Sequence, residues 1–165
     1  MADSRSRQLS LDTNLLLDLA KPQDFAHEFR EEFQSRGYAL MLAPTVLSEL
    51  EYLLTYGGES RRRLAQTASE EIEAWRLTPF GLSEVNHTIA GQFSRVLQQQ
   101  CLIPADEFND ALILAETSLA EVPFLVTSDR HLLNIDEDAL RLAFQEVDLW
   151  PVHPVHPKRL LKALR

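Results

Sequence analysis

The chain has 165 residues, a length that suits one compact domain able to bury a core without disulfides or a structural metal. Sixteen Lys and Arg against 25 Asp and Glu give a net charge of -9, which argues against a broad nucleic-acid-binding surface and leaves only a local basic rim for a phosphate backbone. A single cysteine excludes an internal disulfide, and the polar first ten residues and the short apolar runs exclude a signal peptide and a membrane-spanning helix, so we expect a cytoplasmic protein.

Short apolar segments alternate with longer helical ones in the first hundred residues. In chain order we expect a strand at Gln8 to Leu11, a helix at Thr13 to Ala20 stopped by Pro22, a helix from about Gln23 to Arg36 ended by Gly37, and a buried strand at Tyr38 to Leu42. We then expect a helix from Pro44 or Thr45 to Gly57, helices at about Glu59 to Trp75 and Ser83 to Gln100, and between these two a link, Leu77 to Phe80, that also suits a short strand.

The same alternation continues to the end of the chain. We expect Cys101 to be buried, a helix from Pro104 to a point before Pro123, a buried strand at Phe124 to Thr127, an edge strand at Phe144 to Val152, and a terminal helix opened by Pro157. Strands that alternate with helices predict an α/β fold, a three-layer α/β/α sandwich with a short, mainly parallel central sheet.

Active sites of such folds lie at the carboxyl ends of the strands, and two aspartates stand there. Asp12 directly follows the first strand, and Asp129 follows Leu125-Val126-Thr127-Ser128. If the two strands are parallel, both carboxylates lie at one edge of the sheet. Each aspartate also suits a helix N-cap or a turn, and the two roles are compatible.

A third carboxylate, Asp110, lies on a helix that is apolar almost all round. At about 100 degrees per residue, the narrow polar strip of this helix contains Asp106, Asp110, Thr117 and Glu121. The strip either faces water or lines a groove in which a cation compensates the carboxylates. A fourth carboxylate comes from the helix after Tyr38 to Leu42, where periodicity alone leaves Glu49 and Glu51 as alternatives.

The order of these pieces resembles the PIN domain, including VapC-type toxin ribonucleases. The residues that carry the resemblance are Asp12-Thr13-Asn14, the early-helix Glu49, Asn109-Asp110-Ala111-Leu112-Ile113-Leu114-Ala115, and Leu125-Val126-Thr127-Ser128-Asp129. They span nearly the whole chain, from Leu9 to the Pro157 helix, so we expect residues 1–165 to form a single PIN-like nuclease domain. A longer helical segment at about 58–102 and the acidic net charge depart from the family pattern.

The resemblance implies a metal-dependent ribonuclease that hydrolyses RNA phosphodiester bonds. It implies Asp12, Glu49, Asp110 and Asp129 as catalytic residues and ligands of one or two Mg²⁺ or Mn²⁺ ions, with Asn14, Thr127 and Asp106 in support. Oxygen ligands suit such hard cations independently of the family, and a bound ion activates water and stabilises charge on phosphate. Next to Asp129, Arg130 and His131 are candidates for contact with the substrate phosphate.

The partners implied are an RNA substrate, an antitoxin protein if the chain is a toxin, and a second copy of the chain in a homodimer. Two alternatives remain for the function: a non-catalytic PIN-like domain that binds nucleic acid or protein, and a receiver-like phosphoryl-transfer domain. The receiver-like alternative is the weaker of the two, because this sequence lacks the lysine that receiver domains place after a late strand.

Overall fold

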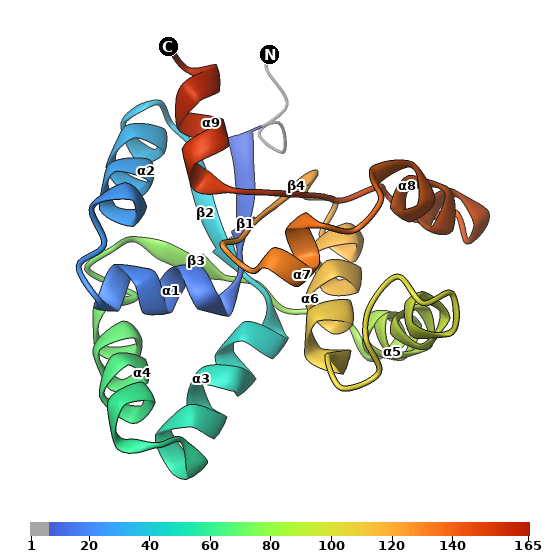
Figure 1. Ribbon diagram of the computed structural model, residues 1–165, viewed down its shortest axis with the longest axis horizontal. Coiled ribbons are helices and arrows are strands. Elements are labelled where there is room, and N and C mark those ends of the chain that lie inside the picture. Colours follow the sequence, from blue (N-terminus) through green and yellow to red (C-terminus); the bar gives the residue numbers. More distant parts are fainter. Residues whose placement is uncertain (1–6) are drawn as a thin grey trace.

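A five-stranded sheet lies at the centre of the chain, with helices around it, in a computed structural model that describes residues 7–165 (Figure 1). The strands are β1 (Gln8–Leu11), β2 (Ala39–Leu42), β3 (Leu77–Pro79), β4 (Phe124–Val126) and β5 (His153–Val155). Their order is β3-β2-β1-β4-β5, and every neighbouring pair is parallel. The predicted α/β fold with a short parallel sheet is therefore confirmed. The polar start of the chain, residues 1–6, lies outside the described residues.

Helices connect the strands and cover the sheet (Figure 1). They are α1 (Thr13–Ala20), α2 (Asp24–Ser35), α3 (Pro44–Tyr56), α4 (Glu59–Glu71), α5 (Glu84–Gln99), α6 (Phe108–Leu119), α7 (Arg130–Leu133), α8 (Glu137–Glu146) and α9 (Pro157–Ala163). Helix α5 packs on α6, α4 packs on α1 and α3, and α9 packs on α2. Among the helices of residues 7–165, none combines the length and the apolar character needed to cross a bilayer.

The strand order reverses beside β1, which makes this strand the centre of the sheet. Strands β2 and β3 extend to one side of β1, and β4 and β5 extend to the other. Ligands of open parallel sheets bind at such a reversal, beyond the carboxyl ends of the strands. The order also differs from the 2-1-3-4-5 order of flavodoxin-like and receiver folds, so the receiver-like alternative is wrong.

Apolar side chains of the three central strands fill the core. Leu11, Leu40, Leu42, Leu125 and Val126 are completely buried. In β1 and β4 the buried residues are successive rather than alternate, which is what a sheet covered on both faces requires. The continuous apolar runs in the sequence are explained by this double burial.

The predicted edge strand at Phe144 to Val152 is wrong, because Phe144 lies in α8. The side chain of Asp136 accepts a hydrogen bond from the backbone N–H of Ala139 at 2.8 Å and caps this helix. Leu140, Ala143 and Phe144 are buried at the spacing of one helix face. The true edge strand, β5, begins only at His153.

Two helix boundaries also differ from the prediction. Helix α4 ends at Glu71 instead of Trp75, because the chain turns at Arg76, with φ 55°, into β3. The short strand considered for the link at Leu77 is confirmed. Helix α6 begins at Phe108 instead of Pro104.

The expected burial of Cys101 is wrong as well, since its side chain is exposed. This residue follows the C-terminus of α5 with φ 57°, a left-handed conformation that ends the helix and turns the side chain outward. Burial was expected because a single cysteine without a disulfide or metal-ligand partner often fills a core, but the position of Cys101 at the end of a helix decides its environment.

A buried carboxylate joins α3 to α6. Glu116 of α6 is only 3% exposed, and it accepts hydrogen bonds from the backbone N–H of Thr45 at 3.0 Å and from the Thr45 hydroxyl at 2.8 Å. Burial raises the pKa of Glu116, and the two hydrogen bonds from Thr45 oppose this rise. The carboxylate therefore satisfies the first turn of α3 and fixes α3 against α6.

We predict that Glu116→Leu lowers the free energy of unfolding by about 1 to 3 kcal/mol, because it leaves the buried N–H of Thr45 without an acceptor. Glu116→Gln, which keeps one acceptor oxygen, should cost less. Urea denaturation measures both, with Glu59→Gln at an exposed position of α4 as the control. Equal stability of the Glu116→Leu and Glu59→Gln variants would show that this bond does not hold the helices together.

Candidate metal centre

The carboxylate of Asp12 lies buried where β1 and β4 end side by side. Asp12 directly follows β1, its backbone N–H donates to the carbonyl of Val126 at 3.0 Å, and its side chain is 2% exposed. The hydroxyl of Thr127 donates to Asp12 Oδ2 at 2.8 Å. Although Asp12 occupies the N-cap position of α1, its side chain makes no capping hydrogen bond, so the carboxylate is directed elsewhere.

Asp129 reaches the same edge of the sheet from β4. The hydroxyl oxygen of Thr127 accepts a hydrogen bond from the backbone N–H of Asp129 at 3.0 Å while it donates to Asp12. Asp129 Oδ1 accepts from the N–H of His131 at 2.8 Å and caps α7. The expected turn or cap role of Asp129 is thus present together with its position beside Asp12.

Glu49 approaches from α3 and is held by two other elements. The hydroxyl of Thr13, at the start of α1, donates to Glu49 Oε1 at 2.7 Å, and the side chain of Asn109 from α6 also bonds to it. Burial raises the pKa of Glu49, whereas these hydrogen bonds and the charge of Arg61 lower it. The alternative, Glu51, is exposed and does not line the cavity described below.

The tightest acidic group contains a residue that the sequence analysis did not select. Glu107, Asp110 and Asp129 each offer a carboxylate oxygen, and these three oxygens lie within 4.8 Å of one another. Burial raises the pKa of Asp110, and a hydrogen bond with Glu107 raises it further. Glu107 precedes α6 three residues before Asp110, the spacing that places two side chains on one face of a helix, and this spacing was the available signal.

These acids line one cavity of about 750 Å³. Its walls come from the starts of α1 and α6, from α3, and from Arg61 of α4. Of the residues selected from the sequence, the cavity lining includes Asp12, Asn14, Glu49, Asp106, Asp110 and Asp129. Thr127 lies behind the lining and connects Asp12 to Asp129. The exposed Asp106 lines the cavity but does not belong to the cluster of three oxygens.

One other expectation about an individual residue needs correction. Thr117, placed with Asp110 on one polar strip, is completely buried, and its hydroxyl donates to Ser10 Oγ in β1 at 2.9 Å. Arg130 and His131 line a neighbouring pocket with Gln98 and Asn134, and their contact with a substrate phosphate stays a prediction. His131 Nε2 nevertheless lies 3.5 Å from Glu107 Oε1, so the pocket and the acidic cavity adjoin there.

The donor set fits a hard divalent cation. All three clustered ligands are carboxylate oxygens, which Mg²⁺ and Mn²⁺ prefer. Ligand atoms around an octahedral Mg²⁺ lie about 3 to 4 Å apart, so only a small contraction of the cluster would be needed. The hydrogen bond between the Glu107 and Asp110 carboxyls requires a proton that a cation would replace.

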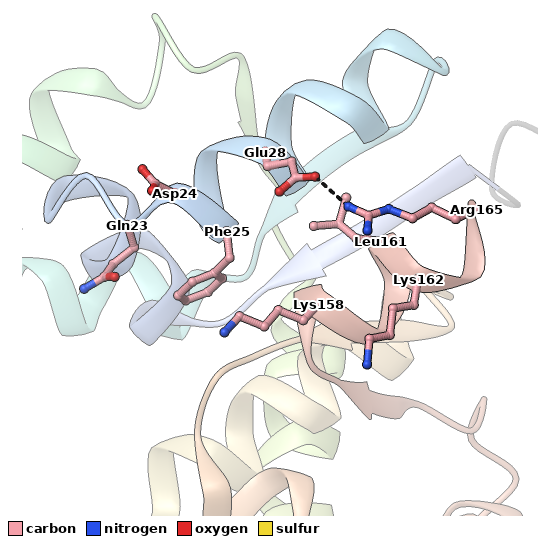
Figure 2. A pocket seen from close by; sticks show the side chains of 8 residues that line it. All are labelled: Gln23, Asp24, Phe25, Glu28, Lys158, Leu161, Lys162 and Arg165. Atoms are coloured by element: carbon pink, nitrogen blue, oxygen red, sulfur yellow. Dashed lines mark hydrogen bonds and ion pairs between the residues drawn. The ribbon is translucent and has the colours of Figure 1, made fainter.

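A separate pocket between α2 and α9 has a different character (Figure 2). Figure 2 shows Lys158, Lys162 and Arg165 of the C-terminal segment opposite Phe25 and Glu28 of α2. The Lys158 ammonium lies 5.1 Å from the centre of the Phe25 ring, and Arg165 pairs with Glu28 at 3.2 Å. Two of the three basic side chains are thus engaged with α2, and these contacts attach the end of the chain to the body of the fold.

Comparison with known proteins identifies the family. The family model described as PIN domain matches residues 9–160, so the chain belongs to the PIN-domain family. No curated protein matches the chain.

Three solved structures illustrate the likeness of the fold. The chain is similar to VapBC2 from Rickettsia felis bound to a promoter DNA fragment, with 19% identity, a TM-score of 0.60, and coverage of 90% of this chain and 98% of that chain. It is also similar to VapBC-1 from nontypeable Haemophilus influenzae, with 19% identity, a TM-score of 0.56, and 92% and 98% coverage. FitAcB from Neisseria gonorrhoeae matches with 18% identity, a TM-score of 0.54, and 90% and 97% coverage.

We predict that the metal-free protein loses stability as the pH rises. Burial raises the pKa of Asp12 to about 7; the charges of Glu49 and Asp129 act in the same direction, and the hydrogen bond from Thr127 opposes them. A carboxyl whose folded pKa lies above its unfolded pKa favours folding while protonated, and this contribution is lost as the pH rises through the folded pKa. In EDTA, thermal unfolding should therefore show a loss of up to roughly 2 kcal/mol between about pH 5.5 and about pH 7.

The Asp12→Asn protein supplies the control for this pH dependence, because it cannot ionise at that position. Its unfolding temperature in EDTA should depend less on pH over the same interval, and the remaining dependence comes from Asp110, whose pKa burial also raises. An unchanged pH dependence in this variant would assign the effect to other groups.

Proposed function

We propose that the protein is a metal-dependent ribonuclease, acting as a single PIN-like domain in the cytoplasm, that hydrolyses the phosphodiester bonds of RNA. The observation that carries this proposal is the meeting of Glu107, Asp110 and Asp129 within 4.8 Å beside the buried Asp12, at the reversal of the strand order. Membership of the PIN-domain family supports it.

The residues divide into ligands and residues that hold the ligands. Asp12, Asp110 and Asp129 would bind Mg²⁺ or Mn²⁺ together with Glu107, and Glu49 would complete the site directly or through water. When bound, one or two such ions lower the pKa of water and stabilise the charge that develops on the phosphate. Thr127 orients Asp12, and Thr13 and Asn109 orient Glu49. One of the carboxylates would accept the proton of the attacking water.

A role as the toxin of a toxin-antitoxin pair is a further part of the proposal. The likeness to VapBC and FitAcB structures and the sequence resemblance to VapC-type toxins support it. The partners would then be RNA, an antitoxin protein and a second copy of the chain.

The alternative is a non-catalytic PIN-like domain that binds nucleic acid or protein. The four acids selected from the sequence are all present in one cavity and are joined by Glu107, an arrangement that binding alone does not require. This favours the nuclease.

We predict that purified protein cleaves labelled single-stranded RNA with Mn²⁺ or Mg²⁺ and not with EDTA. Asp12→Asn should reduce the rate by about a hundredfold or more, because an uncharged ligand loses several kcal/mol of the stabilisation that the cation provides. The matched control is Asp138→Asn, whose carboxylate is exposed on α8 and should have little effect. Mn²⁺ binding without cleavage would favour the non-catalytic alternative, and absence of Mn²⁺ binding would exclude the metal centre.

Thr127→Val is predicted to weaken Mn²⁺ binding by about tenfold or more with little change in size. The substitution removes the hydroxyl that orients Asp12 and accepts from the N–H of Asp129, and loss of such a supporting bond costs about 10- to 100-fold in affinity. Isothermal titration calorimetry measures the affinity, and Thr88→Val on the exposed side of α5 is the control. Unchanged affinity would assign Thr127 a purely structural role.

A further inference from the structure

Two tyrosines on α3 present their rings to solvent. Tyr52 is 62% exposed and Tyr56 is 72% exposed, and their ring centroids lie 5.1 Å apart with the planes at 44°. They are four residues apart and therefore neighbours on one face of the helix. Rings exposed to this extent leave much of their apolar surface in water, which marks a surface suited to a planar partner.

This aromatic pair begins at the acidic cavity. Tyr52 lines the cavity together with Glu49, which precedes it by three residues on the same helix. Tyr56 continues the same face of α3, and at 1.5 Å per residue its Cα lies about 10 Å along the helix axis from that of Glu49. Glu49, Tyr52 and Tyr56 thus form a row that leads away from the proposed metal centre.

A positive charge stands beside the row. Arg61 of α4 is the one Lys or Arg among the described residues that line the cavity. Its neighbours are engaged elsewhere, since Arg62 donates to the carbonyl of Gly57 and Arg63 pairs with Glu59. Within residues 7–165, Arg61 acts on Glu49 through its charge and makes no hydrogen bond or ion pair, so its guanidinium is available to an anion.

We propose that Arg61, Tyr52 and Tyr56 form a binding track for single-stranded RNA. Arg61 contacts a phosphate next to the scissile one, and the two tyrosine rings stack on the bases of adjoining nucleotides. This inference rests on the proposed ribonuclease function and specifies its substrate as unpaired RNA, because bases within a duplex offer no free face to a side chain.

The composition of the row favours RNA over a protein partner. A strand with its phosphate at the acids passes Tyr52, because this ring is itself part of the cavity wall. The aliphatic neighbours on α3, Leu53 and Leu54, are half-buried against the core, so the row lacks the continuous aliphatic surface that a protein helix would cover. Stacking on tyrosine also tolerates any base, which predicts weak sequence preference along this track.

The test measures the binding of a short fluorescein-labelled, pyrimidine-rich RNA to the full chain in Ca²⁺. Fluorescence anisotropy reports the binding, and a gel checks that the RNA keeps its length. The double variant Tyr52→Leu/Tyr56→Leu should weaken binding about tenfold to a hundredfold, as expected for lost base stacking. Tyr52→Phe/Tyr56→Phe keeps the rings and should bind like wild type. Leu142→Ala, an exposed apolar position on α8, is the matched surface control.

An abasic RNA separates stacking from a general effect on the surface. With bases removed at the nucleotides next to the cleavage site, wild type and the Leu double variant should bind equally. Arg61→Gln should instead lower the dependence of log Kd on log salt by about one unit, as for one lost phosphate contact.

The possible outcomes distinguish failure of the proposed RNA-binding track from failure of the proposed ribonuclease function. RNA cleavage in Mn²⁺ by wild type, with RNA binding unaffected by the Leu double variant, would overturn the track alone. An unaffected RNA affinity with a changed sedimentation coefficient would overturn it in favour of a protein interface. If wild type neither binds nor cleaves RNA, the track and the ribonuclease proposal both fall.

Discussion

The hydroxyl of Thr127 makes the contact on which the acidic centre depends. It donates to Asp12 and accepts from the backbone of Asp129, and so it joins the ends of two strands that are neighbours in the sheet and far apart in the sequence. The parallel pairing of β1 with β4 places this bond where the strand order reverses. Burial of Asp12 at that point makes its ionisation costly, and the cost is offset by this hydrogen bond and, in the proposed function, by a cation.

The remaining acids are positioned by helices whose relative placement is itself fixed by buried polar groups. Glu116 satisfies the first turn of α3, and Thr117 on the next residue of α6 bonds to Ser10 in β1. Helix α6 is thereby tied both to the sheet and to α3. Because Asp110 lies on α6 and Glu49 lies on α3, these distant bonds set the distance across the cavity.

The sequence was sufficient for the parts of the fold governed by local patterns. Continuous apolar runs predicted β2 and β4, a short stretch containing Leu9 and Leu11 predicted β1, and the carboxyl ends of β1 and β4 predicted where Asp12 and Asp129 lie. Helix α8 was missed because its last residues were assigned to an edge strand at Phe144 to Val152, although Leu140 and Phe144 have helical spacing and Asp136 is a suitable cap. The error shows that a short amphipathic helix is easily overlooked when its polar face dominates its composition.

Tertiary contacts decided what local patterns left open. Periodicity could not separate Glu49 from Glu51, and the contacts of Glu49 with Thr13 and Asn109 come from other elements. Glu107 was missed although the helix expected from Pro104 already placed it three residues before Asp110. The structure puts Glu107 at the N-cap position of α6, beside Asp110. The buried Glu116 was not predictable, because a carboxylate in an apolar helix looks like an exposed residue until its partner on α3 is known.

The separation of Asp12 from Thr127 along the chain also has a consequence for synthesis. The two residues are 115 positions apart, and Asp129 lies two residues further on. A nascent chain therefore carries Asp12 and Glu49 long before it carries Thr127 and Asp129, and the acidic centre closes only after β4 has emerged from the ribosome and paired with β1. The acidic centre therefore cannot form until most of the chain has been translated.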